Sequence, residues 1–263
     1  MRRRVGHLLL LRWGITLVRV PPMSEIVIFI IMQFFILTYT GKPLGESGEC
    51  CNTNYDFTKA CKKCGTGARV LGNLRTKGLT KIGKDFFETI DGDAIISAKF
   101  KEDMMMSNIK IGELTKIVDY KGPKLPFYHL TSEFMMPKAT EIKGLNIEDQ
   151  CNVCNHNGYF NEAIIGNIKL GIPTVVKPVE LFYNNVDAGF LKQSEVFLSW
   201  EHMGKSNLVA HDKYVVRYAR PLLIVSELFY NFLTSKGVKN FEVEKINFAP
   251  GANIASASLV SEP

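Results

Sequence analysis

The sequence predicts an α+β domain built mainly from antiparallel sheet, with few helices and an inserted zinc-ribbon-like metal site. Three observations lead to this expectation. The chain has 263 residues, of which 46% are hydrophobic, and this is enough to bury a full core. Its apolar residues come mostly in short stretches bounded by Gly, Pro and Asn, which is typical of strands. Two Cys-x-x-Cys pairs, at residues 61–64 and 151–154, interrupt this pattern.

The first 31 residues differ from the rest of the chain in charge. They carry five arginines and one acid, so they supply +4 of the formal net charge of +6. Three arginines before an apolar run resemble the start of a secretory signal, but Arg12 interrupts that run and Pro21-Pro22 stops a helix before it spans a bilayer. Met32 is itself a candidate start. We therefore treat residues 1–31 as an N-terminal extension outside the fold, with a membrane anchor through residues 1–39 as the alternative.

Residues 32–250 are expected to form a single α+β domain that begins with a strand. The apolar run at residues 26–39 is shorter than the roughly 18 residues of a membrane span, and its β-branched and aromatic side chains favour a buried strand. A loop rich in Gly, Ser and Asn follows to about residue 58. Residues 70–80 contain two glycines and are expected to be an irregular link.

The remaining elements are also predicted to be short. Methionines at residues 104–106 and 135–136 are expected to fill the core. The clearest helix follows Ser226, a candidate N-cap, and ends at Gly237. Residues 251–263 are expected to be a disordered tail. Extended segments or strands are expected at residues 85–90 (or a short helix), 94–98, 109–119, 126–134, 173–178, 195–200, 221–225 and 241–246.

The two cysteine pairs carry the strongest chemical signal in the chain. Two thiolates separated by two residues can bind one metal ion, and the residue after each pair, Gly65 or Asn155, suits the left-handed backbone of the turn. Four sulfurs make the closed tetrahedral shell of a structural zinc ion, which leaves no position for a catalytic water. We expect zinc knuckles at residues 61–65 and 151–155. The predicted zinc ligands are Cys61, Cys64, Cys151 and Cys154.

The spacing of the pairs leaves alternatives open. The pairs are separated by 86 residues, so the sequence does not guarantee that they meet, and redox-active or unrelated buried cysteines are the other readings. His156 could replace a missing sulfur. Cys50 and Cys51 are adjacent and are expected to be spectators, because neighbouring cysteines do not easily ligate one ion together.

Other functional classes have weaker support. The body of the chain carries only +2, which argues against nucleic-acid binding. We expect no enzymatic activity and no small-molecule substrate, because nothing in the sequence fixes the geometry of a catalytic set. The segment 200–212 combines an aromatic residue with charges of both signs, which suits a protein-binding surface. The polar residues considered for catalysis were His202, His211, Glu201, Asp212, Ser199 and Ser206.

The layout of the cysteine pairs resembles the bacterial double-CXXCG motif family. The likeness covers residues 32–248 and includes the segment 223–229, which with its following helix and Gly237 is similar to the C-terminal part of several immunity proteins. The sequence departs from the motif at Asn155. The resemblance implies a cytoplasmic immunity-type protein that binds and neutralises a cognate bacterial toxin. The alternative is a zinc-ribbon nucleic-acid-binding protein, in which Lys62 and Lys63 would contact phosphate.

Overall fold

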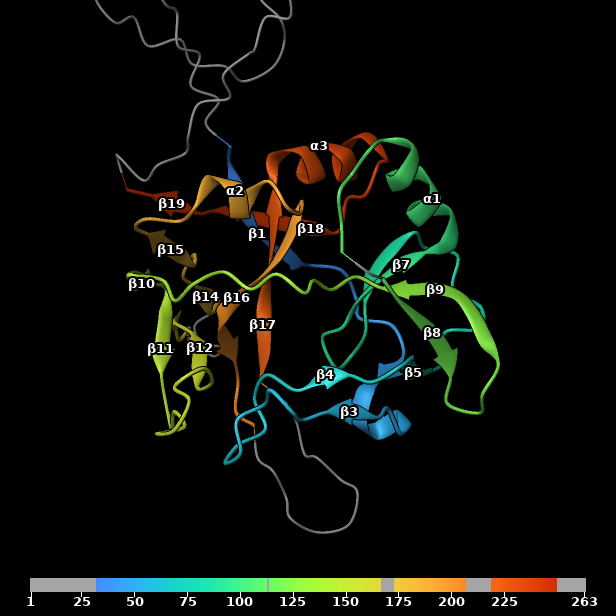
Figure 1. Ribbon diagram of the computed structural model, residues 1–263, viewed down its shortest axis with the longest axis horizontal. Coiled ribbons are helices and arrows are strands. Elements are labelled where there is room, and N and C mark those ends of the chain that lie inside the picture. The colour runs from blue at the N-terminus through green and yellow to red at the C-terminus, as the bar shows by residue number, and fades with distance from the viewer. Residues whose placement is uncertain (1–31, 113, 167–172, 207–218, 250–263) are drawn as a thin grey trace, which may run out of the picture.

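The computed structural model describes residues 32–112, 114–166, 173–206 and 219–249 (Figure 1). The predictions for residues 1–31 and 251–263 therefore lie outside the described residues. Within them the protein is mostly sheet with three α-helices, which confirms the expected mainly-sheet fold. None of the helices in these ranges has the length and hydrophobicity to cross a membrane.

The first six-stranded sheet contains β1, the strand expected at the start of the domain. It lies between β17 and β18, with Phe34 opposite Ser226 and Phe35 opposite Lys245. All neighbours are antiparallel except the parallel pair β12 and β16. In spatial order the strands are β11 (Leu145–Ile147), β12 (Tyr159–Asn161), β16 (Val196–Met203), β17 (Arg220–Ser226), β1 (Phe34–Tyr39) and β18 (Phe241–Lys245).

The second six-stranded sheet closes on itself. Backbone hydrogen bonds from Leu44 N–H to Glu88 O (2.8 Å) and from Ile90 N–H to Gly45 O (3.0 Å) connect the segments beside its two outer strands. The strand β5 falls within residues 70–80, so the expectation of an irregular link there is wrong: β5 pairs in parallel with β8, a long-range contact that local composition does not signal. In spatial order the strands are β2 (Glu46–Ser47), β5 (Leu74–Lys77), β8 (Thr115–Asp119), β9 (Lys124–His129), β7 (Ala94–Ser97) and β6 (Phe86–Glu88).

Three smaller sheets and two short helical elements complete the described residues. The two-stranded sheet β3–β4 precedes β5, and β13–β14 pair Ala163 with Val176. Their bounds are β3 (Tyr55–Asp56), β4 (Arg69–Val70), β10 (Glu141–Lys143), β13 (Ala163–Ile164), β14 (Val175–Val176), β15 (Glu180–Tyr183), β19 (Asn247–Phe248), η1 (Gly48–Cys51) and α2 (Ala188–Leu191).

A hydrophobic cluster shared by the two large sheets holds the molecule together. Leu37 and Val225 come from the first sheet, and Phe86 and Ile96 come from the second. Burial of this apolar surface stabilises the fold at roughly 25 cal/mol per Å². The helices α1 (Ala98–Met106) and α3 (Glu227–Ser235) lie side by side at one end of the molecule and cover this cluster (Figure 1).

The two nine-residue helices had different sequence signals. The helix α3 (Glu227–Ser235) begins as predicted, with Phe229 N–H donating to the Ser226 hydroxyl (3.2 Å), and Gly237 follows it with φ +72°. The helix α1 (Ala98–Met106) was not predicted, because it follows β7 directly and its two buried positions, Phe100 and Met104, make a weak helical pattern.

The methionine runs are only partly in the core. Met104 in α1 is fully buried, whereas Met105 and Met106 are 64% and 75% exposed, so the expectation that all three fill the core is wrong. Helical phase explains the difference, since consecutive residues of a helix point to different sides. Met136 is buried as expected.

Candidate metal centre

Each cysteine pair lies in the connection of a two-stranded antiparallel hairpin. The first knuckle, residues 61–65, lies between β3 and β4, where Tyr55 is opposite Val70. The second knuckle, residues 151–155, lies between β11 and β12, where Ile147 is opposite Tyr159. Both connections lie near each other at the bottom of the view in Figure 1.

The four predicted ligands meet at one point, which we call the four-cysteine cluster. The sulfurs of Cys61 and Cys151 are 3.9 Å apart, those of Cys64 and Cys154 are 3.6 Å apart, and all four lie within 4.8 Å of one another. A tetrahedron with metal–sulfur bonds of about 2.3 Å has edges of about 3.8 Å. All four are free thiols at separations well beyond the roughly 2.05 Å of a disulfide. The cluster is therefore positioned to bind a metal ion.

The two knuckles share one backbone conformation. Gly65 has φ +76° and donates its N–H to Cys61 O at 2.8 Å. Asn155 has φ +56° and donates its N–H to Cys151 O at 2.9 Å. The left-handed residue after each pair was expected from the sequence, since Gly and Asn adopt this conformation at the lowest cost.

Polar contacts support the cysteines from outside. The Cys64 sulfur lies 3.1 Å from the Thr66 hydroxyl, and Cys151 donates its N–H to the Asn157 side-chain oxygen at 2.9 Å. Lys63 Nζ donates to Asn152 Oδ1 at 2.7 Å, which links the tips of the two knuckles. These contacts fix the orientation of the sulfurs.

The thiols of the cluster have different affinities for protons. Burial raises the pKa of the Cys64 thiol and raises that of Cys154 to about 12. Burial also acts on Cys151, but hydrogen bonds from the backbone N–H groups of Cys154 and Val153 outweigh it and bring the pKa of that thiol to about 7. Cys151 is thus the thiol most readily deprotonated for metal binding, because the thiolate is the metal ligand.

His156 does not belong to the cluster. Its ring stacks on Trp200 with 4.0 Å between centroids, and its backbone oxygen accepts the N–H of His202 at 2.7 Å. Burial lowers the pKa of His156. The four sulfurs complete a metal shell without it.

The segment 200–212, expected to form a protein-binding surface, begins as a strand and not as a loop. Trp200, Glu201 and His202 belong to β16, where Glu201 and His202 are buried, and residues 207–212 lie outside the described residues. The Ser199 hydroxyl donates to the backbone oxygen of Glu201, so it is occupied by the strand itself.

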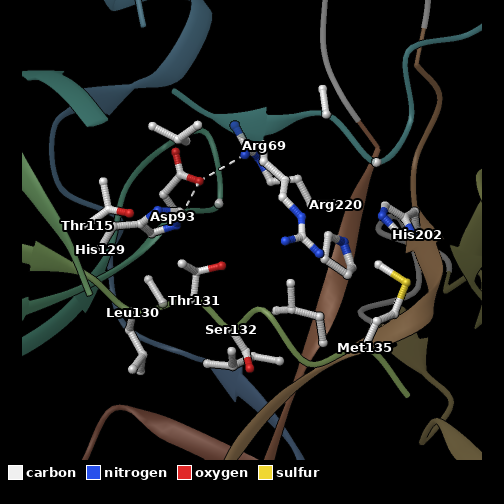
Figure 2. A pocket seen from close by; sticks show the side chains of 18 of the residues that line it. Arg69, Asp93, Thr115, His129, Leu130, Thr131, Ser132, Met135, His202 and Arg220 are labelled. Carbon is white, nitrogen blue, oxygen red and sulfur yellow. Dashed lines mark hydrogen bonds and ion pairs between the residues drawn. The ribbon is translucent and has the colours of Figure 1, made fainter. Parts of the chain in front are cut away.

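A cavity of about 360 Å³ lies between the two large sheets, close to the first knuckle (Figure 2). At its wall the buried Asp93 carboxylate accepts from Arg220 Nη1 (2.8 Å) and from the Ser47 hydroxyl (2.5 Å), and lies 3.5 Å from His129 Nε2. His129 Nδ1 is buried and has no hydrogen-bond partner among the described residues. Burial lowers the pKa of His129, while Asp93 opposes this effect. Sequence reasoning missed this group, because its members lie far apart in the chain.

A wider depression of about 820 Å³ borders this cavity and shares Arg220 with it. Its two cations already contact acids: Arg220 is paired with Asp93, and Lys205 is paired with Asp149. Burial raises the pKa of the Glu88 carboxyl, Asp93 adds to this effect and Arg220 opposes it. The lining carboxylates are Glu49, Glu88, Asp91 and Glu148.

Comparison with known proteins gives no relative. No protein-family model matches the chain, and no curated protein matches it. The resemblance to the double-CXXCG family therefore rests on the cysteine pairs and on the C-terminal segment.

Proposed function

We propose that the chain is a cytoplasmic immunity-type protein that binds a cognate bacterial toxin, with one structural zinc ion in its four-cysteine cluster. The observation that carries this proposal is the closed donor set. Four sulfurs from two hairpins lie at the corners of a metal-sized tetrahedron. Such a closed site stabilises the fold and leaves no position for a substrate.

Zinc is the metal that fits these donors best. Sulfur-only tetrahedral sites favour zinc or iron, and zinc is the usual metal of Cys-x-x-Cys hairpin tips. When bound, zinc supplies a cross-link between the hairpins. The N–H groups of Gly65 and Asn155 and the hydroxyl of Thr66 hold the cysteines in place. The pairing of two hairpin tips is also the reason to propose a zinc-ribbon-like site.

The depression next to Arg220 is the binding surface that we propose for the toxin. Its cations are already paired, so Glu88 and Glu148 leave an excess of negative charge in the lining. A partner that presents basic side chains is complementary to this surface. Complementary charge also accelerates association, which an immunity protein needs in order to act before the toxin does.

The nucleic-acid-binding alternative would use the knuckle lysines. Lys62 and Lys63 are both exposed at this tip, and Lys63 also donates to Asn152 Oδ1 at 2.7 Å. A phosphate surface needs several such cations together. We therefore rank this alternative second, and it can be tested by titration of the zinc-loaded protein with a DNA duplex at two salt concentrations.

The proposal is tested by co-expression with the product of the neighbouring gene in a bacterial host. We expect protection from killing, and a one-to-one complex with an interface of about 1,200 to 2,000 Å². The charge reversals Glu88→Lys and Glu148→Lys should slow complex formation at least about tenfold at low salt. The matched control is Glu102→Lys, an exposed acid in α1 that does not line the depression.

Two results would contradict the proposal. One is turnover of a substrate by the purified protein at catalytic ratios. The other is equal protection by the depression variants and by Glu102→Lys, together with unchanged association rates. Folding of each variant is checked first by its thermal unfolding curve, so that a loss of protection caused by misfolding is not mistaken for a loss of binding.

A further inference from the structure

The side chains of Cys50 and Cys51 bring their two sulfurs close together. They occupy the short helix η1, which ends at Asn52 with φ +62°, and their sulfurs are 3.6 Å apart. This separation is close to the edge of about 3.8 Å between two thiolates on one tetrahedral metal ion. Adjacent cysteines do not easily ligate one ion together, but this turn brings both sulfurs to a spacing that one ion could accept.

Two carboxylates lie beside these thiols, at the seam where the second sheet closes. A carboxylate oxygen of Glu46, on β2, lies within 4.8 Å of both sulfurs. Asp91 Oδ2, from the turn after β6, lies 3.7 Å from the Cys50 sulfur and accepts the N–H of Ser47 at 2.8 Å. A sulfur and an oxygen ligand of one tetrahedral zinc ion are separated by about 3.5 Å.

The charges of this group favour a cation. Burial raises the pKa of both thiols, and the charges of Glu46 and Asp91 raise them further. Lys77 contacts Glu46 at 3.4 Å. In the described part of the chain this is the one ion pair to any of the two thiols and two carboxylates. A divalent ion would stabilise the two thiolates and the carboxylates together.

We propose that Glu46, Cys50 and Cys51 form a second divalent-metal site, specific for thiophilic ions such as Zn²⁺ or Cd²⁺, with one coordination position open beside Asp91. Binding releases the two thiol protons to solvent and involves no change of oxidation state. Because Cys50 is exposed, its ion should exchange faster than the ion in the four-cysteine cluster. Asp91 also lines the depression proposed for the toxin, but metal binding at this site does not depend on that proposal.

The test is a metal titration of the full-length protein under a phosphine reductant, after removal of metal with a chelator. We expect two equivalents of Cd²⁺ per chain, the second bound more weakly. The double variant Cys50→Ser with Cys51→Ser should bind one equivalent. It should lose about a third of the sulfur-to-cadmium charge-transfer absorbance, because it lacks two of the six cysteines.

A second variant keeps the test decisive if loss of the buried Cys51 impairs folding. Glu46→Gln retains both thiols and should weaken the second equivalent by at least about tenfold. Its matched control is Glu141→Gln, since Glu141 is also an exposed glutamate that contacts a lysine at 3.4 Å. The proposal would be overturned if the unmodified protein bound only one equivalent of Cd²⁺. It would also be overturned if Glu46→Gln and Glu141→Gln bound the second equivalent with the same affinity.

Discussion

The two knuckles share a backbone conformation but stand on supports of different strength. The first knuckle closes an isolated hairpin, because among the described strands β3 and β4 pair only with each other. The second closes a hairpin whose strand β12 continues into a six-stranded sheet through β16. An isolated two-stranded hairpin is marginally stable in water. The comparison indicates that a metal ion would tie a weak hairpin to a strong one, so the first knuckle should depend on it more.

Metal removal should have the largest effect on the stability of the two hairpins. Loss of an ion present at about a hundred times its dissociation constant lowers the free energy of unfolding by about 3 kcal/mol. We expect amide exchange to accelerate most at Cys61, Gly65 and Leu71, whose N–H groups are bonded within the first hairpin. Amides of β12 should accelerate less. Hydrogen exchange with and without a chelator measures both effects.

The variants Cys64→Ser and Cys154→Ser provide the control for metal removal. Each variant removes one ligand from a different knuckle, so both should abolish tight metal binding. Both should also show the same difference in amide exchange between the two hairpins. Equal acceleration of amide exchange in β4 and β12 after chelation would show that the two hairpins are equally stable without the ion, which would contradict the difference proposed between them.

Sequence reasoning succeeded where the signal was local. The knuckles were predictable because the paired cysteines and the residue after each pair define the turn, and α3 was predictable from Ser226 and its helical spacing. It failed where distant segments meet. Asp93 and Arg220 are 127 residues apart, and β5 gains its place from β8. The cavity and the thiol–carboxylate group follow from such contacts, which no short window of sequence contains.

Substitution at the left-handed position of each knuckle should have the next largest effect. Gly65→Ala forces a side chain into that conformation and should cost about 1 to 2 kcal/mol of unfolding free energy, with weaker metal binding. Asn155→Gly should be neutral within about 0.5 kcal/mol, because the relaxed turn offsets the more flexible unfolded chain. Chemical denaturation and metal competition measure the two quantities.

Gly72→Ala is the matched control for this pair of substitutions. Gly72 also has a positive φ, +81°, and an added Cβ would meet nothing within 4 Å. It should therefore lower stability through backbone strain and leave metal affinity unchanged. Weaker metal binding by Gly72→Ala would mean that strain in this region, and not the knuckle turn, controls the site.

Acid should weaken the support behind the second knuckle by a smaller amount. Burial lowers the pKa of His202 to about 4, whereas an unfolded histidine has about 6.5. Between these values the unfolded chain binds more protons, so stability falls as pH decreases. From pH 7 to 5.5 this histidine should account for about 1 kcal/mol. Denaturation of metal-saturated protein should show a shallower pH dependence in His202→Gln, and an unchanged one would contradict the assignment.

The smallest effect should come from the contact that joins the two knuckle tips. Lys63 donates to Asn152 at 2.7 Å at the protein surface, and exposed contacts of this kind contribute about 0.5 kcal/mol or less. A double-mutant cycle with Lys63→Ala and Asn152→Ala isolates the coupling, and Lys62→Ala with Asn152→Ala is the matched cycle for a neighbouring lysine without this bond. Because the contact needs both hairpins in place, the Lys63 coupling should be measurable with metal and fall to zero after chelation. A coupling that survives chelation would show that the hairpins stay together without the ion. The packing of the first hairpin, and not the metal, would then hold it in position.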